Sequence, residues 1–137
     1  ATTLGAGLRD VKRVGRGAAF GDLDGDGDMD VVVVNLNDRP SVFENRGGPS
    51  ASLRMRLKSD GKNREAVGAR VKVGRIERTV RRNRSFQASS EARLVFGLGA
   101  AASVEAVSVR WPDGSRETFG PFPAGASVDL TAGKGRK

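Results

Sequence analysis

Hydrophobic and polar residues alternate with a period of two along much of the chain after residue 50. Leu53, Met55 and Leu57 alternate with arginine and lysine, the pattern of a half-buried strand. The same alternation predicts further short strands at 67–73, 75–81, 94–98, 107–111, 116–119 and 128–130. Because helical periodicity is lacking, we expect an all-β fold, an antiparallel β-sandwich or barrel. Its predicted core is formed by Leu53, Leu57, Val71, Leu94, Phe96, Val107, Val109 and Trp111.

Turn-forming residues divide this pattern. Pro112-Asp113-Gly114 is a strong turn signal, which should join the strands on either side into a hairpin. Gly47-Gly48-Pro49-Ser50 has the composition of a linker, and residues 133–137 have that of a disordered basic tail. We therefore expect two regions, an N-terminal hairpin region at 1–50 and a β domain at 51–137.

The N-terminal region has strand signals at 17–20, 31–35 and 41–45, and the loop between the first two is strongly acidic. Carboxylates occur at every second position of this loop, at Asp22, Asp24, Asp26, Asp28 and Asp30. These groups repel one another in water, whereas Ca²⁺ binds about 6–8 oxygen ligands. Gly25 and Gly27 permit the tight curl that would aim several carboxylates at one centre. We predict a calcium site; the alternative is an acidic surface turn without metal.

The loop is not an EF-hand. An EF-hand starting at Asp22 needs a glutamate at its twelfth position, followed by a helix, and that position is Val33 in a run of four valines. Such a run favours a buried strand. The expected ligands are the side chains of Asp22, Asp24, Asp26 and Asp30, with the backbone carbonyl of Asp28.

Composition narrows the possible functions. The chain has no cysteine and no histidine, which excludes disulfides, thiol catalysis and imidazole general-base chemistry. We therefore expect no enzymatic activity. No run of 18 apolar residues occurs, so no membrane span is predicted. Charge is uneven, with six basic and eight acidic residues in 1–50 against eighteen and eight in 51–137.

Part of this positive charge is concentrated in one segment. The arginine stripe, as we name it, consists of Arg75, Arg78, Arg81, Arg82 and Arg84. It could bind an anion such as phosphate, an acidic glycan or an acidic protein face. The alternative is a solvated strand face. Nucleic acid is not favoured, because the chain has one tryptophan and no tyrosine for base stacking.

Two stretches resemble known families. Residues 17–45, GAAFGDLDGDGDMDVVVVNLNDRPSVFEN, resemble an FG-GAP or VCBS-type calcium repeat, a blade unit of β-propellers. Residues 51–119 resemble the ASPIC/UnbV domain, which follows such repeats in cartilage acidic protein and in large bacterial exported proteins. The matching stretches are NREAVGARVKV, RNRSFQASSEARLVFGLG and VEAVSVRWPDGSRETF. The resemblance implies an exported β protein with a calcium-stabilised element and no catalytic role.

The acidic loop occurs once, so the chain supplies a single propeller-blade-like element, which cannot close a propeller. We therefore expect an extracytoplasmic calcium-binding module whose partner is another protein chain or a further part of the same polypeptide. The alternative is a cell-surface module that binds an anionic polymer, an acidic or phosphate-rich chain, through the arginine stripe.

Overall fold

The computed structural model describes residues 12–25, 28–46, 51–85 and 88–137, and the chain divides into two compact units. The N-terminal unit contains the described residues of Ala1–Gly48 and of Asn83–Glu91. The C-terminal unit contains those of Pro49–Arg82 and Ala92–Lys137. The described residues of 83–91 thus belong to the N-terminal unit, although in sequence they lie within the region expected to form the β domain. The linker expected at 47–50 lies outside the described residues.

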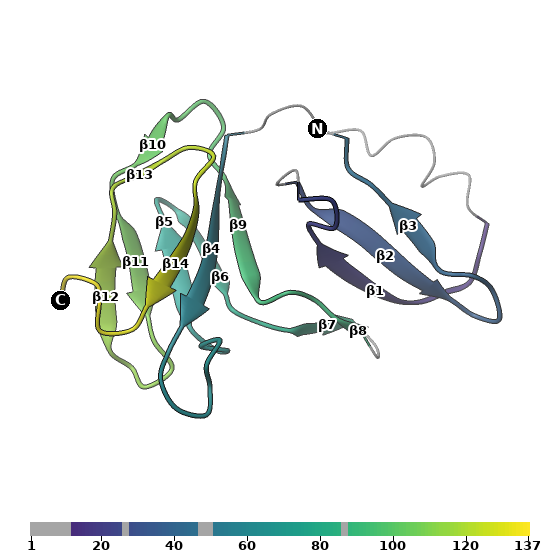
Figure 1. Ribbon diagram of the computed structural model, residues 1–137, viewed down its shortest axis with the longest axis horizontal. Coiled ribbons are helices and arrows are strands. Elements are labelled where there is room, and N and C mark those ends of the chain that lie inside the picture. Colours follow the sequence, from purple (N-terminus) through teal and green to yellow (C-terminus); the bar gives the residue numbers. More distant parts are fainter. Residues whose placement is uncertain (1–11, 26–27, 47–50, 86–87) are drawn as a thin grey trace. The chain divides into compact units, whose positions relative to one another are not determined.

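The N-terminal unit is built on an antiparallel sheet in the order β1-β2-β3 (Figure 1). Its strands are β1 (Gly15–Gly21), β2 (Asp30–Asn35) and β3 (Ser41–Phe43). They coincide with the three segments expected from the sequence. The valines of β2 are β-branched residues, which fit the pleated surface of a sheet. The acidic loop connects β1 to β2.

A short ribbon completes this unit. It consists of β7 (Asn83–Ser85) and β8 (Ala88–Ser89), an antiparallel pair beside β1. The backbone N–H of Phe20 on β1 donates a hydrogen bond to the buried hydroxyl of Ser90, at 3.2 Å. This contact attaches the ribbon to the sheet. Phe86, expected to plug one end of the sandwich, lies outside the described residues.

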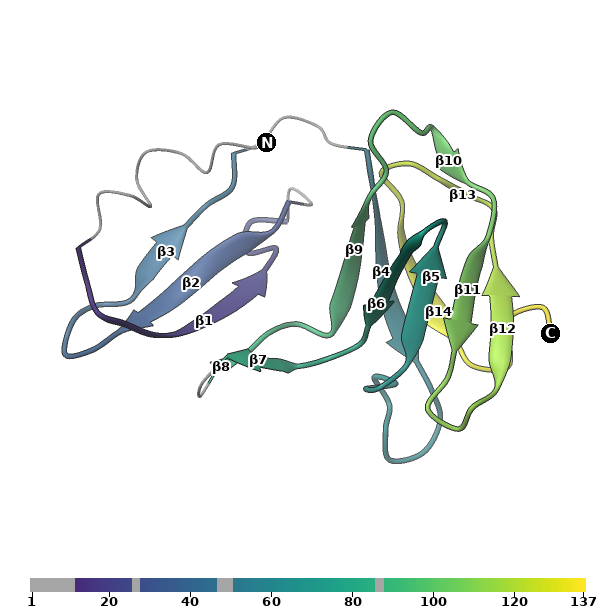
Figure 2. The same cartoon turned by 180° about the vertical axis from the view of Figure 1, so that it is seen from behind.

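The C-terminal unit is a sandwich of two sheets (Figures 1 and 2). The first has the order β14-β4-β9, from β14 (Ser127–Thr131), β4 (Ser52–Lys58) and β9 (Arg93–Gly97). The second has the order β12-β11-β5-β6, from β12 (Arg116–Phe119), β11 (Val107–Arg110), β5 (Arg70–Val73) and β6 (Ile76–Thr79). A small ribbon of β10 (Ser103–Val104) and β13 (Phe122–Pro123) pairs separately.

The core lies between these two sheets. Every core residue expected from the alternation is buried, and Phe96, Leu53, Val71 and Val107 are fully inaccessible. The ring of Trp111 meets that of Phe119 edge to face, with centroids 6.4 Å apart. The all-β sandwich is therefore confirmed, and the described strands form separate sheets that do not close into a barrel.

One strand pairing differs from the expected antiparallel arrangement. Strand β14 runs parallel to β4, with Val128 opposite Met55 and Leu130 opposite Leu57. Strand β9 pairs with the other edge of β4 in the antiparallel sense. Parallel pairing places Leu130 at the core face with 2% of its surface exposed. Alternation shows which side chains of β14 face inward but not the direction of the strand.

The strand expected at 67–73 begins only at Arg70. The Asn63 side chain bonds to the backbone of Val67 twice, accepting from its N–H and donating to its carbonyl, each at 2.9 Å. Ala66, directly before Val67, has a φ of 48°, which an extended strand excludes. Val67 therefore does not face the core as the alternating pattern predicts, and 40% of its surface is exposed.

The C-terminal residues 133–137 do not form the disordered tail expected from their composition. Thr118 on β12 exchanges two backbone hydrogen bonds with Arg136, of 2.7 and 2.9 Å. The buried carboxylate of Glu117 accepts hydrogen bonds from the backbone N–H groups of Gly133 and Gly135, at 2.7 and 2.8 Å. The need of this buried charge for donors therefore orders the last residues.

Candidate metal centre

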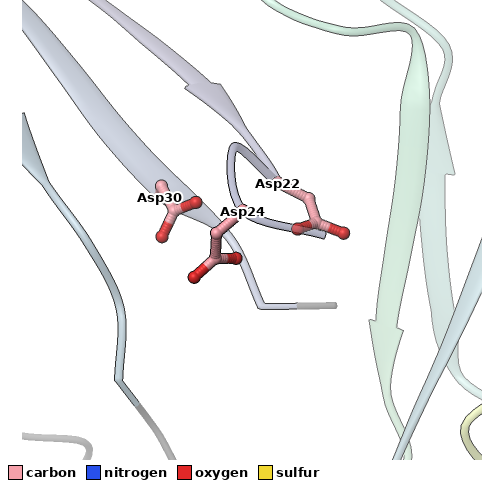
Figure 3. A group of neighbouring side chains, drawn as sticks. All are labelled: Asp22, Asp24 and Asp30. Carbon is pink, nitrogen blue, oxygen red and sulfur yellow. The ribbon is translucent and has the colours of Figure 1, made fainter. Parts of the chain in front are cut away.

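Three of the five predicted metal ligands converge in the N-terminal unit. The carboxylates of Asp22, Asp24 and Asp30 each offer an oxygen, and these oxygens all lie within 4.8 Å of one another. Figure 3 shows that Asp22 and Asp24 come from the loop after β1, whereas Asp30 begins β2. Asp26 lies outside the described residues, and Asp28, whose predicted ligand is its backbone carbonyl, is not among the three clustered carboxylates.

Asp30 is the most buried member of the cluster, with only 1% of its surface exposed. Its Oδ2 accepts a hydrogen bond from the backbone N–H of Leu23, and its Oδ1 accepts one from that of Asn45, both at 2.8 Å. The carboxylate therefore connects the acidic loop with the segment after β3. This role needs no metal and was not foreseen from the sequence, because Asn45 is distant along the chain.

Asp22 shapes the beginning of the loop. Its Oδ1 accepts a hydrogen bond from the backbone N–H of Gly25 at 2.8 Å. Gly25 has a φ of 81°, a left-handed conformation that a residue with a Cβ rarely adopts. The Asp22 side chain thus holds a turn over residues 22–25.

A cationic side chain lies near this cluster. Arg46 donates to both oxygens of Glu44, from Nε at 2.9 Å and from Nη2 at 3.3 Å. The hydrogen bond and the charge of Glu44 raise the pKa of Arg46, and the charge of Asp24 acts in the same direction. The guanidinium thus feels the negative field of the loop, although its principal partner is Glu44.

The donor set fits a hard divalent cation. All three side chains offer carboxylate oxygens, the ligands that Ca²⁺ and Mg²⁺ prefer, and no nitrogen or sulfur donor is among them. Three carboxylates fall short of the 6–8 ligands of Ca²⁺, so backbone carbonyls or water would supply the others. Their close approach also concentrates negative charge, which a bound cation would neutralise.

The residues of the arginine stripe are divided between the two units. Arg84 belongs to the N-terminal unit, whereas the other four arginines belong to the C-terminal unit. The guanidinium of Arg78 lies over the ring of Phe96, 5.5 Å from its centroid, and Arg82 forms an ion pair of 3.0 Å with Glu65. Arg75 and Arg81 are exposed. Two of the five therefore make contacts within the sandwich.

Within the described residues, the structure contains no helix long and apolar enough to cross a membrane.

Comparison with curated proteins finds no match for this chain. The family described as ASPIC and UnbV matches residues 59–137, more than half of the chain. The match begins after the acidic loop, so the FG-GAP or VCBS character of residues 17–45 stays a prediction. It also reaches the last residue, including the segment that packs against Glu117. The C-terminal unit places the chain in the ASPIC and UnbV family, to which it therefore belongs.

Proposed function

We propose that this chain is a non-catalytic, extracytoplasmic module that binds calcium and assembles with another protein chain or with a further part of its own polypeptide. The observation that carries the proposal is the uneven distribution of the hydrophobic core. Every buried hydrophobic side chain of the described residues belongs to the C-terminal unit.

The N-terminal unit exposes apolar side chains instead. Val42 on β3 is 63% exposed and Val34 on β2 is 50% exposed. The pairing of Val32 with Val42 places Val34 and Val42 on the same face of the sheet. Among the described residues, this exposed apolar face adds no burial to the stability of the N-terminal unit, and exposed apolar patches often mark interaction sites. A partner that covers this face would supply the missing burial.

The acidic cluster supports the calcium part of the proposal. Three carboxylate oxygens lie within 4.8 Å of one another, and one of the three carboxylates, Asp30, also accepts a hydrogen bond from the loop. A bound cation would neutralise the repulsion between these carboxylates and stabilise the loop. Calcium is scarce in the cytosol, so a weak site of this kind favours an extracytoplasmic setting. The role is structural, because the described cluster offers ligands but no histidine or cysteine for chemistry.

Replacement of Val34 and Val42 by threonine tests the assembly part. The intact chain should bind a hydrophobic dye, self-associate or retain one stoichiometric protein in high salt, and the double variant should lose this behaviour. Threonine keeps the β-branched shape, so the sheet should persist. The matched control is Ile76→Thr in the C-terminal unit, where Ile76 is 45% exposed. A monomer that binds no dye, with residues 31–45 protected from hydrogen exchange, would contradict the proposal.

The calcium part is tested separately by calorimetric melting of the intact chain in chelator and in millimolar calcium. A ligand at about 100 times its Kd should stabilise the folded state by about 2.7 kcal/mol. An unchanged melting temperature would remove calcium from the proposal and leave the assembly part standing.

A further inference from the structure

Several basic residues lie on the outer face of the sheet β12-β11-β5-β6, and none of them belongs to the arginine stripe. Residues alternate along each strand, so the buried Val71 and Val109 face the core, and their neighbours face outward. The outward residues include Arg70 and Lys72 on β5, Arg110 on β11 and Arg116 on β12, all exposed.

Strand register aligns three of these arginines in one row. Arg110 lies directly opposite Arg116 on one side and Arg70 on the other. Adjacent strands are about 4.8 Å apart, so neighbouring arginines of the row are separated by about one strand spacing. Like charges in directly opposite positions destabilise a sheet. An anion laid along this row would relieve that repulsion.

The C-terminal segment enlarges the basic face. Arg136, held beside Thr118 by the two backbone hydrogen bonds, and Lys137 join the row in lining a surface hollow of about 420 Å³. The lining includes six basic residues and two acidic ones, Glu77 and Glu117, so its side chains carry a net charge of +4.

Neither acid neutralises the row. Glu77 lies 3.7 Å from Arg70, and both side chains are more than half exposed, so this pair is screened by water. The Glu117 carboxylate is buried and accepts the N–H groups of Gly133 and Gly135. The positive charge of the face is therefore left for an external anion.

A second hollow extends this surface beyond the end of the sheet. It measures about 220 Å³ and is lined by Gly68, Arg70, Arg110, Trp111, Pro112 and Gly114. Arg70 and Arg110 line both hollows, so the two are adjacent. An extended ligand with repeated anionic groups fits this arrangement better than one isolated anion.

The character of the lining favours an acidic polysaccharide. Guanidinium groups match carboxylate and sulfate oxygens in paired hydrogen bonds, and the hydroxyls of Ser108 and Thr118 can bond to sugar hydroxyls. The larger hollow has no aromatic side chain on which the bases of a single strand could stack. The face is a sheet surface, not a helix or ribbon that could enter the major groove of a duplex.

We propose that the outer face of β5, β11 and β12, with Arg136 and Lys137, binds a polysaccharide that carries carboxylate or sulfate groups. This site is independent of the acidic loop and of the uncovered face of the N-terminal unit. Binding should therefore persist in chelator, and its failure would leave the proposed function intact.

The test uses the full chain with heparin as a sulfated probe, polygalacturonate as a carboxylated probe and dextran as a neutral control. The chain has one tryptophan and no tyrosine, and Trp111 lines the smaller hollow, so its fluorescence reports on this site. We expect saturable binding of at least one acidic probe, with an emission change, and none of dextran. The probe that binds more tightly identifies the acidic group.

The decisive variant is Arg110→Gln with Arg116→Gln, and its matched control is Arg75→Gln with Arg81→Gln, which removes the same charge outside the hollow. The first pair of substitutions should weaken binding roughly tenfold or more. It should also make the slope of log K against log salt less negative by about two. The control should bind within about twofold of the parent chain. Unchanged melting temperatures should show that both double variants fold. If the first pair does not fold, Lys72→Gln with Arg136→Gln replaces it.

Three results would overturn the proposal. Equal losses in the two pairs would indicate unspecific charge attraction, and a larger loss in the control pair would assign binding to the arginine stripe. Equal or tighter binding of an oligodeoxynucleotide or of polyglutamate, at the same salt and charge, would assign the face to nucleic acid or to an acidic protein.

Discussion

Glu117 on β12 and Gly135 near the C-terminus are in direct contact, and the contact leaves no room for a larger residue. The Glu117 Oε2 accepts a hydrogen bond from the Gly135 N–H at 2.8 Å. A Cβ added at Gly135 would lie 2.8 Å from the Glu117 Cβ and 2.8 Å from the Phe119 ring atom Cζ. The C-terminal segment therefore packs on β12 only because residue 135 is glycine.

The first prediction concerns this contact. Gly135→Ala should lower the free energy of unfolding by about 1–3 kcal/mol, because buried atoms must shift to accept the methyl group. Chemical denaturation measures the loss, and hydrogen exchange at residues 131–137 should accelerate. The control is Gly97→Ala, since a Cβ at Gly97 meets nothing within 4 Å. Equal stability of the two variants would show that the segment does not pack as described.

A second prediction separates two roles within the acidic loop. Asp24→Asn should remove the stabilisation by calcium. The melting temperature in chelator should be unchanged or slightly higher, because one repelling charge is lost. Asp30→Asn should lower stability in chelator as well, by about 1.5–3 kcal/mol, because the buried carboxylate accepts two backbone N–H groups. Melting of both variants with and without calcium distinguishes the roles. Identical behaviour of the two would contradict a separate clamp at Asp30.

The third prediction concerns the sandwich core. Phe96→Ala should cost about 3–5 kcal/mol, since the ring is fully buried and its loss also removes the surface under the Arg78 guanidinium. Denaturant unfolding measures the change. Ile76→Ala, on a side chain that is 45% exposed, should cost far less. A small cost at Phe96 would mean that the two sheets do not pack across this ring.

A fourth prediction is a local pH response in the turn between β11 and β12. The Ser115 hydroxyl and then its backbone N–H, at 2.7 and 2.9 Å, hold the pKa of Asp113 below its ordinary value. A lowered folded pKa means that the contribution of this turn is present above the unfolded pKa and is lost as pH falls through the folded one. Titration by NMR should show the lowered pKa, and Ser115→Ala should raise it. An unchanged Asp113 pKa in that variant would contradict the hydrogen bond.

Local pattern was sufficient for the strands and the interior of the C-terminal unit. Leu53 and Val109 could be assigned to the core because a strand alternates its side chains between two faces, which is a property of neighbouring residues. The hairpin at Asp113 followed from turn chemistry for the same reason. The acidic loop was equally visible, since its carboxylates are close in sequence and their repulsion does not depend on the rest of the fold.

Pairings between distant segments needed the tertiary structure. The parallel direction of β14 against β4, and the union of residues 83–91 with the N-terminal unit, depend on which strands meet, and alternation is the same for either choice. The ordered C-terminal segment likewise depends on Glu117, whose buried carboxylate accepts hydrogen bonds from the N–H groups of residues 133 and 135, distant from it in sequence.

The sequence by itself determined the all-β class, the core positions, the acidic loop and the excess of positive charge, because each follows from composition or from residues adjacent along the chain. The tertiary structure alone decided which charges act together. Arg70, Arg110 and Arg116 are far apart in sequence and form one row only because the register of β5, β11 and β12 sets them opposite one another. Strand register is a non-local property, chosen by the burial of the other side of the sheet.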